Sequence, residues 1–312
     1  MIHLRRRNFI ASAFAASLGA ALPAAARARS SSFLKKHDLP AGVQVYAVDP
    51  MVRSDLQDTL NKLAAIGYRT VELAGMHGYT PQQLRSAADT AGLKIASIHL
   101  SDGLLGTTDD DAARIAADLA VLGTRDAVMP MFIFPRDIAR EKDEPFGDYL
   151  QRAARLQGGD LWRRTADLLN ARGAALAAHG VRLAYHNHNA EFEPVDGTTG
   201  WQILKDRIDP KLIDFEIDLG WVAAAGLDPV AFVTEHAGRV RQVHVKDIKA
   251  STVPNFAFRQ DPAEVGAGML DWERLLPAAY AAGVRQFYVE QEPPFVTDRF
   301  TSLAKSFAFL ST

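Results

Sequence analysis

The amino-acid sequence predicts an α/β protein that folds as a single-domain (β/α)8 TIM barrel. From Gly42 onward, short apolar runs rich in β-branched and aromatic residues alternate with longer segments whose apolar residues recur at every third or fourth position. Several short runs directly follow a glycine, which suits the left-handed residue that ends a helix. Eight such units over about 270 residues match a closed barrel, typically ~250 residues, better than an open sheet.

Eight strands are predicted in chain order, each as a short apolar run. They are Val43–Tyr46, Thr70–Leu73, Lys94–His99, Ala127–Pro130, Val181–His186, Leu212–Asp218, Val240–Val245 and Gln286–Glu290. The glycines that stand just before strands are Gly67, Gly92, Gly123, Gly180 and Gly283. Helical apolar spacing connects the strands, as in Leu56–Ile66, Ile115–Leu122 and Leu161–Leu176. The polar segment Phe134–Gly159 is expected to be an insertion after the fourth strand that overhangs the active-site face.

The first 28 residues are predicted to be a targeting segment. Arg5, Arg6 and Arg7 precede an apolar run, Phe9–Leu22, that is shorter than the about 20 residues needed to span a bilayer. Small residues and an A-x-A site at Ala26–Ala28 follow, and Arg6-Arg7 resembles a twin-arginine export signal. We therefore expect a signal peptide at 1–28, a linker at 29–41 and a barrel at 42–312. An ordinary secretory signal and an uncleaved anchor are the alternatives.

Charge and composition restrict the function. The chain has no cysteine, so any metal is left to histidine and carboxylate ligands. Cleavage after Ala28 removes four arginines, which lowers the Lys+Arg count from 35 to 31 against 37 acidic residues and leaves a net charge near −6. A mildly acidic domain without a basic stripe argues against a nucleic-acid partner. The mature protein is expected to be periplasmic, without stable membrane insertion, and a homodimer is left open.

Polar residues gather where the predicted strands end. They are Glu72, His99, His186, His188, Asp218, His244, Lys246, Asp247, Glu290 and Glu292. A single histidine in such a place is more often a packing residue. Imidazoles and carboxylates at the ends of several strands are harder to explain in that way, because burying them unpaired costs several kcal/mol each.

The best ligand set takes one residue from each of four consecutive strands: His186, Asp218, His244 and Glu290. Imidazole and carboxylate ligands suit Mn²⁺, which we favour, as well as Zn²⁺, Co²⁺ or Fe²⁺, and Mg²⁺ is a further alternative. Gln242 and Lys246 share the inward parity of His244, so one of them is expected to contact substrate or to orient a ligand. Asp247 is expected either to support a ligand or to be an ordinary loop carboxylate.

The chain resembles the sugar phosphate isomerase/epimerase superfamily, the xylose-isomerase-like TIM barrels. The resemblance covers nearly the whole chain after the leader. It is carried by the segments Val71–Gly75, Gly92–His99, Tyr185–His188, Asp218–Trp221, Val243–Asp247, Val265–Trp272 and Val289–Glu292. Their order and spacing are fairly specific for the superfamily, but they do not identify the substrate.

The resemblance implies a metal held by Glu, Asp, His and Glu from the fifth to eighth strands. These positions correspond here to His186, Asp218, His244 and Glu290. The first position departs from the family pattern, which puts a symmetric two-glutamate epimerase mechanism in doubt. It also leaves the fifth-strand ligand open, with Glu191 as an alternative, and Glu292 is an alternative at the last position.

The expected reaction is proton abstraction beside a carbonyl of a small sugar or polyol, through a metal-bound enediolate, giving isomerisation or epimerisation. Glu290, His186 and His99 are the expected catalytic groups. The expected substrate-binding residues are Glu72, His188, Lys246 and Trp221.

Three other functions compete with this expectation. A lyase or dehydratase acting on keto-glycosides or inososes would use the same site. A non-catalytic sugar-binding protein would not need Asp218, His244 and Glu290 together. A DNA repair enzyme like endonuclease IV would need a basic surface and a three-metal cluster, and the acidic mature chain argues against it.

Overall fold

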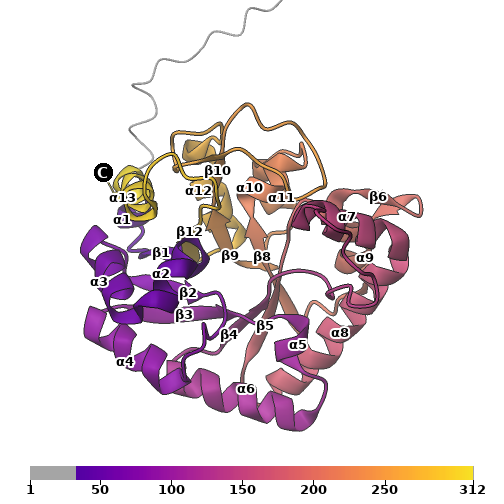
Figure 1. Cartoon of the computed structure of the whole chain (residues 1–312), viewed down its shortest axis with the longest axis horizontal. Helices are drawn as coiled ribbons and strands as arrows, with labels where there is room; N and C mark the ends of the chain where they lie inside the picture. The colour runs from indigo at the N-terminus through magenta and orange to yellow at the C-terminus, as the bar shows by residue number, and fades with distance from the viewer. Residues whose placement is uncertain (1–32, 312) are drawn as a thin grey trace, which may run out of the picture.

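The computed structural model describes residues 33–311 and confirms the closed barrel (Figure 1). Neighbouring strands follow the order β1-β12-β9-β8-β5-β4-β3-β2, and β1 pairs with β2 to close the ring. All the barrel pairings are parallel. The barrel strands are β1 (Ala41–Gln44), β2 (Thr70–Leu73), β3 (Lys94–His99), β4 (Asp126–Met129), β5 (Arg182–His186), β8 (Ile213–Asp218), β9 (Val240–Val245) and β12 (Gln286–Val289).

Helices surround the barrel and cover its outer face (Figure 1). The longer ones are α3 (Leu56–Ile66), α4 (Pro81–Ala91), α6 (Asp109–Leu122), α7 (Phe146–Gln157), α8 (Gly159–Ala177), α9 (Gly200–Arg207), α12 (Trp272–Ala282) and α13 (Arg299–Ser311). The shorter ones are α1 (Phe33–Lys36), α2 (Asp49–Ser54), α5 (Asp102–Leu105), α10 (Leu219–Ala224) and α11 (Pro229–Glu235). Among the described residues, no helix is long and apolar enough to cross a membrane.

Glycine ends helices at the predicted places. Gly92 and Gly123 follow α4 and α6 with φ of 71° and 79°, the left-handed conformation that glycine adopts without a Cβ penalty. Each returns its amide to carbonyls of the last helical turn, and the next strand begins within three residues. The repeated helix, glycine and strand units of the sequence are therefore real structural units.

The N-terminal part of the barrel differs in detail from the expectation. The first strand is Ala41–Gln44, because Val45–Val48 turns into a 3-10 helix (η2) that begins when the Gln44 side chain accepts a hydrogen bond from the Tyr46 amide. Part of the expected linker is structured, since α1 packs against α13 and its Leu34 is buried. The predicted signal peptide, 1–28, lies outside the described residues.

The expected insertion after β4 contains helix α7. Asp148 of α7 forms an ion pair with Arg259 in the segment after β9, and Arg155 pairs with Glu193, which follows β5, at 2.6 Å. These segments both leave the carboxyl ends of their strands, so α7 lies at the active-site end of the barrel. Two small antiparallel pairs are also found there, β6 (Pro194–Val195) with β7 (Thr198–Thr199) and β10 (Asp247–Ile248) with β11 (Pro262–Ala263).

Candidate active site

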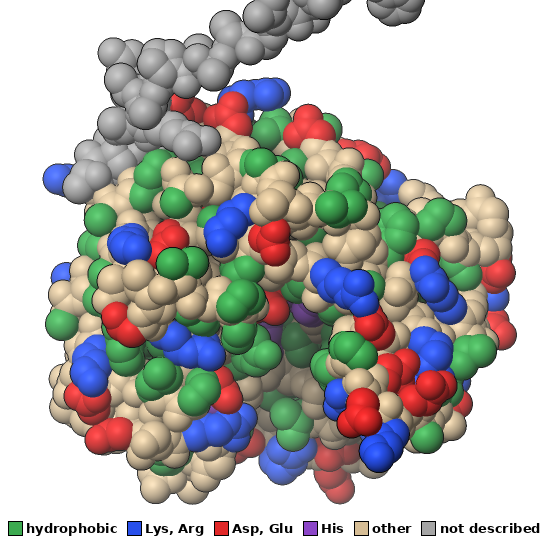
Figure 2. Space-filling view, turned by 45° about the horizontal axis from the view of Figure 1, so that its top comes forward, with side chains coloured by type: hydrophobic (Ala, Val, Ile, Leu, Met, Phe, Trp, Pro, Cys, Tyr) green, Lys and Arg blue, Asp and Glu red, His purple; other side chains and the backbone are tan. Residues whose placement is uncertain are grey.

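The inside of the barrel is lined by polar side chains from six strands. Residues two apart on a strand face the same side, so each strand can place one or two groups inside. The groups are Gln44, Glu72, Ser97, His99, His186, Glu216, Asp218, Gln242 and His244, with Lys246, Glu290 and Glu292 just beyond the strand ends. Figure 2 shows a hollow near the centre of the molecule, and histidine is visible inside it.

His244 on β9 connects two layers of this interior. Its Nδ1 lies 2.9 Å from Glu290 Oε2 and 3.5 Å from Asp218 Oδ2. Its Nε2 lies 2.9 Å from Glu72 Oε1 and 3.4 Å from Glu216 Oε2. The imidazole is fully buried, so its two nitrogens hold carboxylates above and below it in place.

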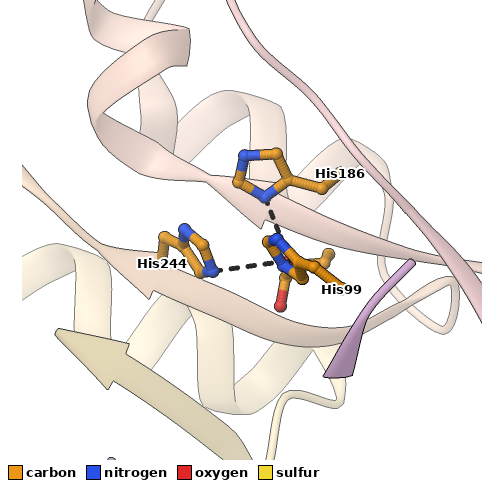
Figure 3. A group of neighbouring side chains, drawn as sticks. His99, His186 and His244 are labelled. Carbon is orange, nitrogen blue, oxygen red and sulfur yellow. Dashed lines mark hydrogen bonds and ion pairs between the residues drawn. The ribbon is translucent and has the colours of Figure 1, made fainter. Parts of the chain in front are cut away.

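The deeper layer is a histidine group formed by His99, His186, Glu216 and His244. Oε2 of Glu216 lies 2.8 Å from His99 Nε2, 3.0 Å from His186 Nδ1 and 3.4 Å from His244 Nε2. Figure 3 shows the three imidazoles pointing toward one another from β3, β5 and β9. Gln242 donates to the second Glu216 oxygen at 2.7 Å and fixes the carboxylate from below.

The upper layer is a lysine cluster formed by Asp218, Lys246, Glu290 and Glu292. The Lys246 ammonium lies 2.8 Å from Asp218 Oδ2, 2.7 Å from Glu290 Oε2 and 2.6 Å from Glu292 Oε1. Only Glu292 retains appreciable exposure, 23% of its side chain, against 1% for Lys246 and 7% for Glu290. Glu292 is therefore the carboxylate of the cluster that is nearest to solvent.

Burial and neighbouring charges shift the pKa values of the histidine group in opposite directions. Burial lowers the pKa of His99, but the Glu72 and Glu216 carboxylates outweigh it and raise that pKa to about 10. Burial, together with the neighbouring Glu72 charge, raises the pKa of Glu216 to about 7. Burial and the adjacent imidazoles hold the pKa of His186 well below its usual range. These groups thus share protons within one buried network.

The lysine cluster shows a similar balance. Burial alone would lower the pKa of Lys246, yet its three carboxylate partners raise that pKa well above the usual range. Burial opposes ionisation of Glu290, but Lys246 and His244 hold the pKa of Glu290 well below its ordinary value. Burial raises the pKa of Glu292. The cluster therefore holds a buried ammonium ion at neutral pH.

The predicted metal set is divided between the two layers. Asp218, His244 and Glu290 form one group of ligand atoms within 4.8 Å of one another, whereas His186 belongs to the histidine group. His186 Nε2 lies 3.9 Å from Asp218 Oδ2, so it borders the upper layer without joining the set. Glu191, the alternative fifth-strand ligand, accepts a hydrogen bond from the Tyr185 hydroxyl at 2.7 Å and belongs to neither group.

The predicted substrate-binding residues lie in different environments. Glu72 is fully buried beneath His244, and Lys246 is enclosed by carboxylates. Trp221 is also buried, with the Lys246 ammonium 4.9 Å from its ring centroid. His188 is partly exposed, and its ring lies 5.5 Å from that of Trp221 and 5.1 Å from that of Phe258. Trp221 Nε1 and His188 Nδ1 have no hydrogen-bond partner among the described residues.

Asp247 points away from both layers and organises a loop. Its Oδ2 accepts hydrogen bonds from the Gly266 and Gly268 amides and the Trp272 indole at 2.9, 3.1 and 2.9 Å. Its Oδ1 accepts from the Leu270 amide at 3.2 Å. The Asp247 side chain therefore supports this loop, and its hydrogen bonds run to loop groups rather than to a candidate metal ligand.

Glu216 is the principal site residue that sequence reasoning missed. It lies inside β8, two residues before Asp218, and every second residue of the strand faces inward. The alternation Phe215-Glu216-Ile217-Asp218 was therefore the signal that could have identified it. Gln44 and Ser97 were missed as well, and they complete the network around Glu72 and Gln242.

The donor atoms of the site suit a divalent cation. The histidine group offers three imidazoles and one carboxylate, and the other group offers one imidazole and two carboxylates. Such ligands bind first-row divalent ions. Within residues 33–311, no lysine or arginine is hydrogen-bonded to the histidine group, whereas the lysine cluster already contains a cation at the centre of its carboxylates. The fit is therefore good in the deeper layer and poor in the upper one.

Comparisons with known proteins agree with this architecture. The chain matches the family described as xylose isomerase-like TIM barrel over residues 60–311. It is 26% identical over 261 residues to the rhizopine catabolism protein MocC of Rhizobium meliloti, covering 76% of this chain and 75% of that protein. It is 25% identical over 203 residues to an inosose dehydratase of Clostridium beijerinckii, covering 63% of this chain and 65% of the relative, just under two thirds of its length.

A solved structure gives the same fold. A sugar phosphate isomerase/epimerase from Parabacteroides distasonis superposes with a TM-score of 0.67 at 23% identity, covering 87% of this chain and 93% of that one. At this identity the likeness shows the shared barrel. The chemistry has to be argued from the site residues.

Proposed function

This chain belongs to the xylose isomerase-like TIM barrel family, and we propose that it is a divalent-metal-dependent enzyme that moves a proton beside a carbonyl of a small sugar or polyol. The observation that carries the proposal is the convergence of buried imidazoles and carboxylates on His244 at the carboxyl ends of the strands. In barrels of this type that end carries the active site. Relatives named as dehydratases support enzymatic activity.

A divalent ion, when bound, would polarise a substrate carbonyl and acidify the adjacent C–H. The candidate ligands are the residues of the histidine group together with Asp218 and Glu290, which share His244 with it. Mn²⁺ is the ion favoured from the sequence, and imidazole and carboxylate donors also suit Zn²⁺, Co²⁺ or Fe²⁺. Metal identity depends on which of the two groups binds the ion.

The proton acceptor is a carboxylate of the lysine cluster. Glu290 is the residue expected from the sequence, but it is held by both His244 and Lys246, at 2.9 and 2.7 Å. Glu292 contacts only Lys246 and is more exposed, so a substrate carbon can reach it more easily. We therefore assign the role of general base to Glu292, with Glu290 fixing Lys246 and His244.

Lys246 and His99 complete the assignment. The Lys246 ammonium beside the base would stabilise the negative charge that develops on an enediolate oxygen. His99 retains 10% side-chain exposure and would donate a proton or a hydrogen bond from the opposite side of the barrel. The unpartnered nitrogens of His188 and Trp221 are suited to substrate hydroxyl groups.

The substrate is proposed to be an uncharged keto-sugar, keto-glycoside or inosose. The resemblance to inosose dehydratase favours a second outcome of the same proton abstraction, the loss of a β-hydroxyl as water, over return of the proton. Both outcomes begin by breaking the same C–H bond. Isomerase, epimerase and lyase activities are therefore tested together.

Export to the periplasm is part of the proposal. The arginine pair Arg6-Arg7, the apolar run after it and the small residues before position 29 support a twin-arginine signal. The mature enzyme would then meet external sugars rather than intracellular sugar phosphates.

Hydrogen exchange in deuterated water tests the proton-transfer step. The metal-loaded protein, without residues 1–28, is incubated with a panel of keto-sugars, 3-keto-glycosides and inososes, and NMR follows each carbon-bound hydrogen. Deuterium should enter the carbon beside the carbonyl, and chelator-treated protein should catalyse this exchange at least about 10²-fold more slowly. Turnover of a substrate without deuterium at any carbon would refute the proposal.

A further inference from the structure

The two candidate ligand groups differ in whether a cation is already present. In the lysine cluster, Lys246 Nζ lies within 2.8 Å of oxygens from three carboxylates. The ammonium group therefore occupies the place among these oxygens that a metal ion would take. The lysine is 1% exposed and its aliphatic chain is enclosed, since a Cβ added at Gly220 would lie 2.7 Å from Lys246 Cγ. Lys246 is therefore held in this position, and a divalent ion would have to expel it.

The histidine group has the opposite character. Four potential ligand atoms, three imidazole nitrogens and Glu216 Oε2, lie within 4.8 Å of one another. The distances from Glu216 Oε2 to the nitrogens are 2.8, 3.0 and 3.4 Å. Ligand atoms about 2.0–2.2 Å from a common ion are separated by about 3 to 3.5 Å, so only small side-chain movements would admit the ion.

Charge in this layer also favours a cation. Glu72 and Glu216 are both fully buried, and in the described part of the chain their hydrogen-bond partners are imidazoles and glutamine amides, with no lysine or arginine among them. The charge of these two buried carboxylates can be balanced here only by protonated imidazoles, the same side chains that would bind the ion. A divalent ion would neutralise both of them.

We propose that the divalent ion binds in the histidine group, to His99, His186, Glu216 and His244, and that Lys246 takes the place of an ion among Asp218, Glu290 and Glu292. This inference rests on the metal dependence proposed above. Three imidazoles and one carboxylate suit Zn²⁺, Co²⁺ or Fe²⁺ better than the Mn²⁺ favoured from the sequence. The metal ion in the histidine group and the Lys246 ammonium in the lysine cluster would then lie on opposite sides of His244.

Counting the imidazole ligands distinguishes the two locations without any change to the protein. The metal-free mature protein is loaded with one equivalent of Cu²⁺, and pulsed electron paramagnetic resonance counts the coordinated imidazoles. The histidine group predicts three, whereas Asp218, His244 and Glu290 would supply one. Fewer than three imidazoles would overturn the assignment.

Two matched substitutions give a second, independent readout. Glu216→Gln and Glu290→Gln both replace a buried carboxylate by an amide of the same shape, one in each group. Calorimetric titration with Zn²⁺ should show at least about 10²-fold weaker binding for Glu216→Gln and a smaller loss, of about 10-fold, for Glu290→Gln, which only supports the ligand His244 through its Nδ1. The reverse pattern would place the ion in the upper layer and overturn the inference.

Circular dichroism and thermal unfolding of both variants establish that they are folded before binding is compared. A wild-type protein that binds no divalent ion would refute the metal dependence itself. A protein that binds an ion through one imidazole would keep that dependence and refute only its location in the histidine group.

Discussion

The ammonium nitrogen of Lys246 lies 2.8 Å from Oδ2 of Asp218, inside the barrel and away from solvent. Asp218 also caps helix α10 by accepting a hydrogen bond from the Trp221 amide at 2.9 Å. The carboxylate thus fixes the start of the helix with one oxygen and the ammonium ion with the other. Asp218, which the sequence predicts as a metal ligand, therefore already contacts a cation of the protein itself.

Replacing Lys246 by methionine should destabilise the fold. The change would leave the carboxylates of Asp218, Glu290 and Glu292 facing one another, and loss of one partner of a buried ion pair costs about 3–5 kcal/mol. Urea unfolding measures the effect, with Lys249→Met at an exposed position as the matched control. Millimolar Mn²⁺ should restore part of the stability of Lys246→Met only. Equal stability of both variants would contradict the described ion cluster.

Two of the three carboxylates that contact Lys246, Glu290 and Glu292, should respond differently to amide substitution. Glu292→Gln should lower turnover by about 10²–10⁴-fold with little change in unfolding, as expected for a positioned general base. Glu290→Gln should lower both turnover and stability, because it loses bonds to His244 and Lys246. Steady-state kinetics and urea unfolding of both variants make the comparison. Full activity of Glu292→Gln would return the role of base to Glu290.

The buried Glu191 should make stability depend on pH. Burial raises the pKa of Glu191 from 4.5 to about 7 in the folded protein. The hydrogen bond that the Tyr185 hydroxyl donates to Glu191 lowers this pKa, but by less than burial raises it. The folded state therefore keeps this proton while the unfolded state releases it. The contribution to the free energy of unfolding should fall by up to about 3 kcal/mol as pH rises from about 4.5 to about 7.

Urea unfolding at pH 5 and pH 8 tests that dependence. Glu191→Gln should show a smaller decrease than wild type between these values, because its own share is removed while that of Glu216, whose pKa is also about 7, remains. Glu273→Gln, at an exposed helical position, should follow wild type. Identical pH profiles for wild type and Glu191→Gln would rule out the shift.

Asp247→Asn should loosen the loop from Gly266 to Trp272. An amide there keeps one acceptor oxygen and turns its NH2 group toward one of two sets of donors, either the Gly266 and Gly268 amides with the Trp272 indole or the Ile248 and Leu270 amides. We expect a loss of about 2–4 kcal/mol and faster hydrogen exchange at those amides. The control is Asp137→Asn on the exposed insertion. Unchanged exchange in the loop would show that Asp247 does not organise it.

Export should depend on the guanidinium groups of Arg6 and Arg7. Replacing both by lysine keeps the charge but removes the pair that the twin-arginine receptor reads, so the precursor should accumulate in the cytoplasm. Fractionation followed by immunoblotting measures the distribution. Normal export of the double variant would identify an ordinary secretory signal.

Strand positions were readable from the sequence because the barrel strands are short apolar runs, most of them following a glycine and ending at polar residues. β2, β3 and β9 have the predicted bounds. β1 was shifted because Val45–Val48 has the composition of a strand but is bent by the side chain of Gln44. That contact is a tertiary detail, and residue preferences alone cannot reveal it.

The site was partly readable for a related reason. Polar residues at strand ends identified His186, Asp218, His244 and Glu290, but composition cannot tell which of them share a layer. That depends on the stagger between neighbouring strands, such as the shift between Phe215 and Glu216 in the pairing of β8 with β9. The direction of Asp247 was equally hidden, because the alternation of a strand ends where the loop begins.

The pairing of β1 with β12 has a consequence for biosynthesis. One neighbour of the first strand in the barrel is β12, which pairs with it through Phe287–Val289 near the end of the chain. Both edges of the unfinished sheet therefore remain unpaired until almost the whole chain has left the ribosome. Pairing between such distant segments also makes folding slow. A nascent chain that stops before Gln286 should therefore be a substrate for chaperones and proteases rather than a smaller stable protein.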